Sequence, residues 1–337
     1  MNNITNAQNP FYGQYHTPHG TVPFDRIETE HYEPAILEGI KLQNAEIEAI
    51  IQNPEKADFS NTIEAFEESG ELLDKVVAVF GNMLSAETND DLQELAQKIM
   101  PLLSEHSNNI TLNEKLFARV KEVYNQKETL QLTQEQKQLL ENAYNSFVRH
   151  GANLEGEARE EYRRLTNELS KLTLTFSENN LKETNAYQML LTKKESLAGL
   201  PKIIIEAAAE TAKSEEKEGW AFTLHAPSYV PFMTYSDNRD LRQKLYMAYN
   251  TKCTHDNEFN NIDIVKNIAN TRMKIAQLLG YKDYAEYTLK KRMAENSKSV
   301  YKLLNQLLEA YTPTAQQEYK EIQELAREEQ GADFVVM

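Results

Sequence analysis

The sequence has only one cysteine, Cys253, in 337 residues. A single cysteine excludes an internal disulfide, and this composition fits a reducing compartment. The N-terminal stretch also lacks the basic and apolar regions of a secretory signal. We therefore expect a cytoplasmic protein.

Long apolar runs are absent as well. An uninterrupted run such as Ile203-Ile204-Ile205 falls far short of the ~20 residues that a membrane span needs. Basic residues are in the minority, because 36 Lys and Arg face 52 Asp and Glu, giving a formal charge of −16. That sign argues against a nucleic acid or an anionic membrane surface as the main partner.

Glycine and proline are scarce, with 11 and 10 occurrences, and apolar residues recur at three- and four-residue spacing along most of the chain. This pattern predicts a mostly α-helical protein. Residues 1–25 are the exception, because Pro10, Pro18 and Pro23 predict an extended arm that lies across a body. We see no linker or repeat after it, so residues 26–337 are expected to form one helical region.

Two helices carry start and stop signals. In the first, Asn61 is placed as the N-cap and Glu64 as its reciprocal partner. An apolar face follows on the same predicted helix, formed by Leu72, Leu73, Val76, Val77, Phe80, Met83 and Leu84. In the second, Thr133 and Gln136 form a capping box and Gly151 supplies the stop.

A longer helix is predicted over residues 155–183, with an apolar seam that steps by four and three: Ala158, Tyr162, Leu165, Leu169, Leu172 and Phe176. Such a seam needs another long helix beside it. We expect this partner to begin after an N-cap at Ser297 and to use the stripe Val300, Leu303, Leu304, Leu307, Leu308 and Tyr311. Pro313 should kink or restart that helix.

The helical period lapses around residues 186–225. "NAYQMLLTKK" and "GWAFTLH" are short and compatible with β-structure, and Pro201 reads as a helix start between them. We expect a small two-stranded ribbon inside a helical body.

The sequence contains no recognisable reactive centre. No two histidines stand at i and i+4 with a glutamate after the first, which is the zinc-binding arrangement on a helix. His16 and His19 form the only close pair, and a surface turn explains them better than a metal site does. Nucleophile-elbow, phosphate-binding and dinucleotide-binding motifs are also missing.

Several residue pairs could suggest chemistry but have simpler explanations. Cys253 lies two residues from His255, yet a catalytic dyad is built in space with a third orienting group, so we interpret Cys253 as a partly buried thiol without a role. Acidic pairs such as Glu67–Glu68 and Glu215–Glu216 are typical of solvated helix faces.

Aromatic residues gather around residues 220–235. Trp220, Tyr229, Phe232 and Tyr235 could line a ligand groove, but aromatics at helical spacing more often belong to a core. From the residues alone, the default reading is an acidic helical protein with an interaction or scaffold role.

Eight short segments nevertheless carry a family resemblance. In order along the chain they are "NPF", "FDRIETEHYEPAI", "SNTIEAFEESGELL", "FVRHGANL", "LAGLP", "SDNRDLRQKLYMAY", "LLGYKDYAEY" and "KRMAENSKSVYKLL". Their order and spacing resemble the N-terminal half of the zinc oligopeptidases, the family that includes dipeptidyl carboxypeptidases, thimet oligopeptidase and oligopeptidase A.

The resemblance implies a long-helix N-terminal half of a clam-shaped zinc peptidase, in which this chain forms one wall of the substrate channel. Oligopeptides are the implied substrates, and release of C-terminal dipeptides is the implied reaction. The family's H-E-x-x-H helix and its other zinc and substrate ligands lie beyond the matched half. We therefore assign no catalytic, cofactor-binding or metal-binding residue here, and we expect zinc only in the complete enzyme.

Two hypotheses follow. In the first, the chain is the N-terminal portion of a zinc peptidase, inactive alone, whose implied partner is the catalytic half; "GADFVVM" at Gly331–Met337 then reads as the start of the connection. In the second, it is a non-catalytic helical protein derived from that family that binds peptides or other partners. For the isolated half we expect the channel-facing surface to expose apolar area that the missing half normally covers, which predicts dimerisation or crystal contacts through that face.

Overall fold

The computed structural model describes residues 9–336, which divide into two compact units after Arg272. The boundary falls inside one helix, α11 (Ile262–Leu278). The prediction of a mostly α-helical fold is confirmed. None of the described helices combines the length and the apolar character that crossing a bilayer requires.

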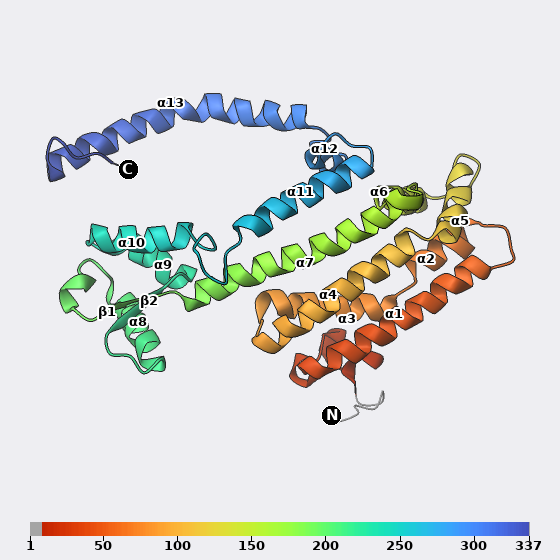
Figure 1. Cartoon of the computed structure of the whole chain (residues 1–337), viewed down its shortest axis with the longest axis horizontal. Helices are drawn as coiled ribbons and strands as arrows, with labels where there is room; N and C mark the ends of the chain where they lie inside the picture. The colour runs from red at the N-terminus through yellow and green to blue at the C-terminus, as the bar shows by residue number, and fades with distance from the viewer. Residues whose placement is uncertain (1–8, 337) are drawn as a thin grey trace. The chain divides into compact units, whose positions relative to one another are not determined.

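The first unit begins with helices that lie side by side (Figure 1). Their bounds are α1 (Thr29–Gln52), α2 (Ala65–Glu67), α3 (Glu71–Ala86), α4 (Asp90–Thr111), α5 (Glu114–Asn125), α6 (Gln134–Arg149) and α7 (Gly156–Ala186). The capping box of Thr133 and Gln136 starts α6 as expected. Gly151 follows the end of α6 with a φ of 84°, the left-handed conformation that favours glycine at a helix stop.

The N-terminal arm is anchored to this body where the structure describes it. Phe11 is buried with its ring centroid 5.3 Å from that of Tyr32. Lys75 Nζ donates to the carbonyl oxygens of Phe11 and Gly13 at 3.1 and 2.8 Å. Residues 1–8 of the expected arm lie outside the described residues. The boundary after residue 25 stays a prediction.

Buried side chains form two clusters among these helices. The first joins α1, α5 and α6 around Leu116, Leu140 and Phe147. The second joins the arm, α1, α3 and α4 around Ile36 and Phe80. The apolar face predicted for residues 72–84 packs in the second cluster, so this part of the prediction is confirmed.

The predicted start of that helix was wrong. A single π-helical turn, Phe59–Glu64, precedes α2, and its N-cap is Asp58 rather than Asn61. Asn61 is the reciprocal partner, because its backbone N–H donates to Asp58 Oδ1 at 2.7 Å and its side chain accepts from Asp58 N at 3.1 Å. Gly70, with a φ of 86°, then separates α2 from α3.

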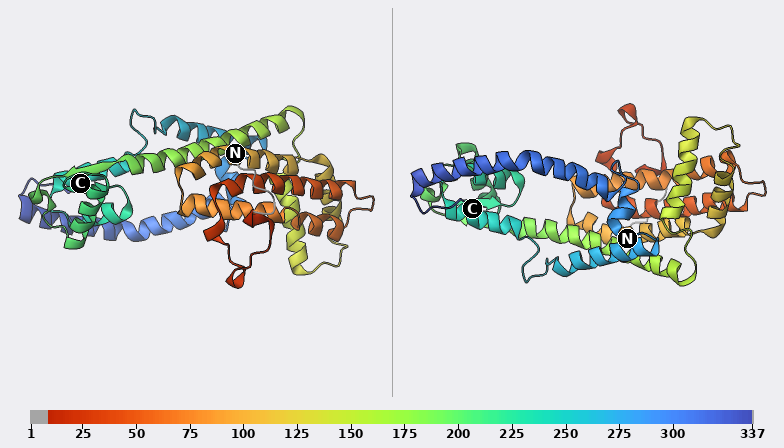
Figure 2. Two further views of the ribbon diagram at one scale, coloured as in Figure 1. Left: turned by 90° about the horizontal axis from the view of Figure 1, so that it is seen from below. Right: turned by 90° about the horizontal axis from the view of Figure 1, so that it is seen from above.

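Helix α7 is the long helix that the seam predicted, and both views in Figure 2 show it unbroken. It packs along α4, a partner that the sequence reasoning did not name. Polar contacts join the two helices, including Ser104 Oγ donating to Asn167 Oδ1 at 2.8 Å and Arg163 pairing with Glu105 at 2.8 Å. Only Tyr162 and Leu165 of the predicted seam are fully buried.

The predicted ribbon is confirmed as β1 (Gln188–Leu191) antiparallel to β2 (Trp220–Thr223), with Met189 opposite Phe222. Helices α8 (Lys202–Ser214), α9 (Ala226–Tyr235) and α10 (Arg239–Asn250) surround it, and Pro201 is the N-cap of α8. The buried cluster of this region centres on Phe222, Phe232 and Leu245.

Two of the resemblance segments meet beside the ribbon. Gly199 of "LAGLP" has a φ of 85°, and a Cβ added there would lie 2.2 Å from the carbonyl oxygen of Tyr235. Asp237 of "SDNRDL" donates its backbone N–H to the carbonyl of Ala198 at 2.9 Å. Only glycine fits this close approach, because a Cβ atom would collide with the carbonyl oxygen. This explains why position 199 is a glycine.

The second unit contains the end of α11, α12 (Tyr284–Leu289) and α13 (Ser297–Gln330). The N-cap of α13 is Asn296, one residue before the expected Ser297. Pro313 lies inside α13, which continues through it as one helix, so the expected restart was wrong. Gly331 caps the C-terminus of α13, and Gln323 Nε2 donates to the carbonyl of Phe334 at 2.8 Å.

Candidate functional site

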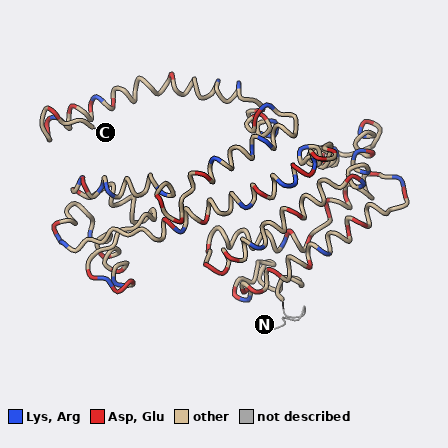
Figure 3. Tube along the Cα trace, viewed as in Figure 1, with Lys and Arg blue, Asp and Glu red and all other residues tan. Residues whose placement is uncertain are grey.

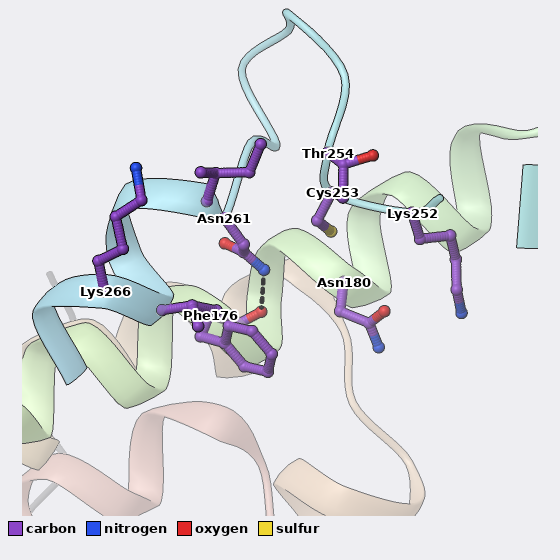
Figure 4. A pocket seen from close by; sticks show the side chains of 9 residues that line it. Phe176, Asn180, Lys252, Cys253, Thr254, Asn261 and Lys266 are labelled. Carbon is purple, nitrogen blue, oxygen red and sulfur yellow. Dashed lines mark hydrogen bonds between the residues drawn. The ribbon is translucent and has the colours of Figure 1, made fainter. Parts of the chain in front are cut away.

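A pocket of about 430 Å³ lies in the first unit between α7, the loop of residues 251–261 and the first turn of α11 (Figure 4). Its apolar wall consists of Phe176, Ile262 and Val265, which are 38%, 43% and 49% exposed. Side chains of this kind are usually buried in a helical body. The pocket therefore offers an apolar contact surface to a ligand.

Polar groups border this apolar wall. Among the described residues, no hydrogen bond is made by the side-chain amide of Asn180, which is one of the residues that line the pocket. Lys252 and Lys266 lie at the rim and point away from its centre in Figure 4. Lys252 Nζ donates to Thr184 Oγ1 at 3.1 Å, and Lys266 pairs with Asp263 at 3.0 Å. The pocket thus combines an apolar wall with one available amide.

Glu183 of α7 holds the loop that forms one side of the pocket. Its carboxylate accepts from the backbone N–H of Cys253, and it lies 2.7 Å from His255 Nδ1. Asn257 Nδ2 donates to the same carboxylate at 3.4 Å. Three positions of the loop are therefore fixed by one side chain.

Asn261 closes the loop onto α7. Its side-chain Nδ2 donates to the carbonyl of Phe176 at 3.0 Å, the bond drawn in Figure 4, and its Oδ1 accepts from Asn179 Nδ2 at 2.9 Å. Its backbone N–H donates to the carbonyl of Cys253 at 2.8 Å. Asn261 is only 3% exposed, so it is a buried residue that links the loop to the helix through hydrogen bonds.

The electrostatics of this loop follow from its burial. Burial raises the pKa of Glu183, but hydrogen bonds from His255, Cys253 and Asn257 outweigh it, so the pKa lies below the usual range. Burial, followed by the neighbouring Glu183 carboxylate, raises the pKa of the Cys253 thiol to about 11. Cys253 also has a φ of 57°, a left-handed conformation that costs a non-glycine residue energy.

The arrangement does not activate Cys253 as a nucleophile. Both ring nitrogens of His255 have other neighbours, since Nδ1 faces Glu183 and Nε2 lies 3.2 Å from Thr251 Oγ1. A raised thiol pKa also lowers the population of the reactive thiolate. Cys253 is 5% exposed and so lies deeper than the partly buried thiol that we expected, while its lack of a role stays a prediction.

The other pairs considered from the sequence lie elsewhere. His19 is in an exposed turn with a φ of 59°. Glu215 pairs with Lys217 at 2.6 Å. Within residues 9–336 there is no group of three or more histidine, cysteine, aspartate or glutamate side chains that could hold a metal ion.

The aromatic cluster divides between core and surface. Phe232 is fully buried, and its ring meets that of Phe222 edge to face at 4.6 Å. Tyr229 stacks on Tyr249 at 4.2 Å, whereas Tyr235 is 51% exposed. None of these side chains lines the pocket of Figure 4.

Sequence reasoning missed Glu183 and Asn261, which organise this pocket. A signal was available: after Phe176 the apolar seam of α7 gives way to "SENNLKETN", and a helix that still packs there must do so through polar side chains. The residues that would receive those bonds could not be identified, because they lie about 70 to 85 positions away.

Comparison with known proteins confirms the family resemblance. Residues 232–337 match the model of a family described as Peptidase family M3. The chain is 33% identical to the dipeptidyl carboxypeptidase of Escherichia coli over 326 residues, which cover 96% of this chain and 48% of the relative. It is 31% identical to oligopeptidase A of Haemophilus influenzae over 316 residues, with 93% and 46% covered.

Oligopeptidase A of Salmonella typhimurium is 29% identical over 329 residues, with 96% of this chain and 48% of the relative covered. The similarity thus extends over almost all of this chain. The chain spans about half the length of the curated relatives that it matches.

Proposed function

We propose that this chain is the N-terminal portion of a zinc metallopeptidase. Almost its whole length is similar to proteins that are named oligopeptidase A and dipeptidyl carboxypeptidase. In this proposal it forms one wall of the channel of a clam-shaped enzyme. The observation that carries the proposal is the 33% identity to a dipeptidyl carboxypeptidase over 96% of the chain.

The pocket between α7 and α11 gives this wall a place to contact a peptide. Phe176, Ile262 and Val265 supply apolar surface for a side chain, and the amide of Asn180 can bond to a peptide backbone. Glu183 and Asn261 hold the loop in place before the peptide arrives, which lowers the entropy lost on binding. The excess of acidic residues would disfavour strongly acidic peptides.

The chemistry of hydrolysis is assigned to the portion that this chain does not include. A bound zinc ion would there polarise the scissile carbonyl and lower the pKa of a water molecule. The chain's own residues bind and orient the peptide and exclude water. A cytoplasmic location belongs to the same proposal and rests on the single cysteine.

The test is to express this chain and, separately, a full-length protein in which its own gene continues past Met337. The full-length protein should hold about one zinc per chain and release dipeptides from short peptides, with loss of activity on chelation. The short chain should do neither. A full-length protein without metal or activity would favour the alternative of a non-catalytic peptide-binding or interaction protein.

The pocket is tested in the full-length enzyme by Val265→Asp, which places a charge on the apolar wall. We expect KM for peptides to rise while kcat changes little, because uniform binding is lost. Arg164→Gln on an exposed face of α7 is the control. Unchanged KM in the Val265 variant would remove the pocket from the proposal.

A further inference from the structure

A second pocket of the first unit, of about 340 Å³, lies where the start of α4 packs on the end of α7. Its α7 residues, Glu178 and Lys182, each stand two positions after Phe176 and Asn180, which is about 200° around the helix. The two pockets therefore lie on different sides of α7. We call this one the α4–α7 pocket, and its lining residues are Asp90, Gln93, Glu94, Gln97, Glu178 and Lys182.

The lining of the α4–α7 pocket is acidic. Figure 3 shows acidic residues gathered at the start of α4. Asp90 and Glu94 are exposed and stand one helical turn apart, and Glu178 adds a third carboxylate from α7. Among the described residues that line the pocket, Lys182 is the one cation. Acidic clusters are common on a chain with a formal charge of −16, so charge alone does not indicate a ligand.

Two buried oxygen atoms distinguish this pocket from an ordinary acidic surface. Gln93 and Glu178 are each 9% exposed, and among the described residues neither Gln93 Oε1 nor Glu178 Oε1 has a hydrogen-bond partner. The other carboxylate oxygen of Glu178 is occupied, because it accepts from Gln97 Nε2 at 2.7 Å and lies 4.0 Å from Lys182 Nζ. Buried acceptors without a donor reduce stability, so a bound hydrogen-bond donor would be favoured here.

We propose that the α4–α7 pocket binds an ammonium group of a linear aliphatic polyamine. A primary ammonium has three N–H donors and a positive charge, so it can donate to Gln93 Oε1 and Glu178 Oε1 and also balance the carboxylate. A metal ion fits less well, because residues 9–336 contain no group of three or more acidic, histidine or cysteine side chains that could hold one.

The distribution of carboxylates favours a ligand with more than one ammonium group. Residues 90–97 extend over about 10 Å of the α4 axis. Glu178 is buried, whereas Asp90 and Glu94 are exposed. An aliphatic chain with ammonium groups several methylenes apart can place one charge on Glu178 and another on Asp90 or Glu94. This binding needs no peptidase chemistry, so it stands or falls separately from the proposed function.

The first experiment titrates spermidine into the intact chain in a calorimeter at about 0.15 M salt, where the Debye length is about 8 Å. We expect one saturable site with a dissociation constant below about 1 mM. Tetramethylammonium has a charge but no N–H donor, so it should not compete. The absence of saturable binding, competition by tetramethylammonium, or displacement of spermidine by an equal concentration of calcium would each overturn the proposal.

The second experiment removes one carboxylate. Glu178→Gln keeps the shape of the side chain but removes its charge, so it should weaken spermidine binding about tenfold or more. Glu67→Gln is the matched control, because it removes the same charge from an exposed acidic cluster at the start of α3. Far-UV circular dichroism confirms that both variants are folded. Equal weakening by the two changes would mean diffuse attraction to an acidic chain and would contradict the proposal.

The third experiment removes the competing side chain. Lys182 Nζ lies near the Glu178 carboxylate, so Lys182→Met should strengthen spermidine binding by removing an ammonium group of the chain itself. Lys171→Met, at an exposed position of the same helix, should change the affinity less. Unchanged or weaker binding in the Lys182 variant would place the ligand away from Glu178 and overturn the proposal.

Discussion

Helices α3 and α13 carry similar apolar patterns but differ in what covers them. In α3, Val76 and Phe80 are 0% and 1% exposed, because α1 and the N-terminal arm pack on their face. In α13, Leu304 and Leu308 are 51% and 65% exposed, and Gln323 is its one described residue that is fully buried. The comparison teaches that periodicity predicts a helix and its apolar face, but does not identify what that face contacts.

The difference has an energetic consequence. Burial of apolar surface stabilises a fold by roughly 25 cal/mol per Å², so residues 9–272 contain most of the side chains that resist unfolding. Half-exposed side chains such as Leu304 and Leu308 of α13 contribute less. The predictions below test this contrast.

The largest effect is expected from Phe147→Ala. Phe147 is 1% exposed and packs against the rings of Phe66 and Phe117, so its loss should lower the free energy of unfolding by about 3–5 kcal/mol. Urea denaturation followed by circular dichroism measures this. The matched change Leu308→Ala in α13 should cost less than about 1 kcal/mol. Similar losses in the free energy of unfolding for Phe147→Ala and Leu308→Ala would contradict the contrast between the buried core and the exposed face of α13.

The next largest effect concerns the thiol of Cys253. Burial and the Glu183 carboxylate raise its pKa to about 11, two pH units above the ordinary value of 9.0. The thiolate population near pH 8 should therefore be about 100-fold lower than in the unfolded chain. The rate of reaction with a disulfide reagent, measured folded and in urea, checks this. A folded rate equal to the unfolded rate would refute the burial of this loop.

The raised pKa of the Cys253 thiol also predicts how the stability of the fold changes at high pH. The folded state holds the thiol proton more tightly than the unfolded state, so the stabilisation is fully present below pH 9 and is lost as the pH rises toward 11. Cys253→Ala should flatten the decline over this window. An unchanged pH profile would show that the thiol does not contribute.

A smaller effect is expected from Glu183→Gln. The change weakens the bonds to His255 and to the N–H of Cys253, so it should lower the free energy of unfolding by about 1–2 kcal/mol. Glu168→Gln on the same helix is the control, because Glu168 makes only an exposed ion pair with Arg164. An equal loss of stability in the two variants would show that the bonds of Glu183 to the loop contribute no more than the exposed ion pair of Glu168.

Acid titration sharpens this prediction. The pKa of Glu183 is lowered in the folded state, so its stabilising contribution is present above the unfolded value of about 4.3 and is lost as the pH falls through the folded value. The difference between the unmodified chain and Glu183→Gln should therefore shrink in acid. A difference that stays constant down to pH 3 would count against the charge of Glu183 as its origin.

The smallest effect belongs to the start of α13. Asn296 accepts the N–H of Ser299 at 3.0 Å, and Asn296→Ala should cost the first turn about 1 kcal/mol. Because α13 has little packing of its own, the loss should be local. Hydrogen exchange should speed up in the first turn of α13 and remain unchanged in α6. Faster exchange in both would mean that the two regions unfold together.

Much of the fold could be predicted from local signals. The capping box at Thr133, the proline before α8 and the lapse of helical period around the ribbon each depend on residues within a few positions. Where several caps were possible, as at Asp58 and Asn61, the sequence did not decide between them. Both are good caps, and the choice depends on how the chain packs afterwards.

The candidate site was much less predictable. Glu183, Asn261 and Cys253 come together only because the loop of residues 251–261 returns to α7. No periodicity marks such a contact, since each residue taken alone reads as an ordinary polar or thiol side chain.

The sequence by itself determined the helical class, the ribbon and the family resemblance, because these depend on short-range periodicity and on ordered local segments. The tertiary structure decided which helix packs along α7 and how Glu183 fixes the pocket loop. Those outcomes depend on contacts between residues far apart in the chain, where packing and burial rather than local propensity set the energy.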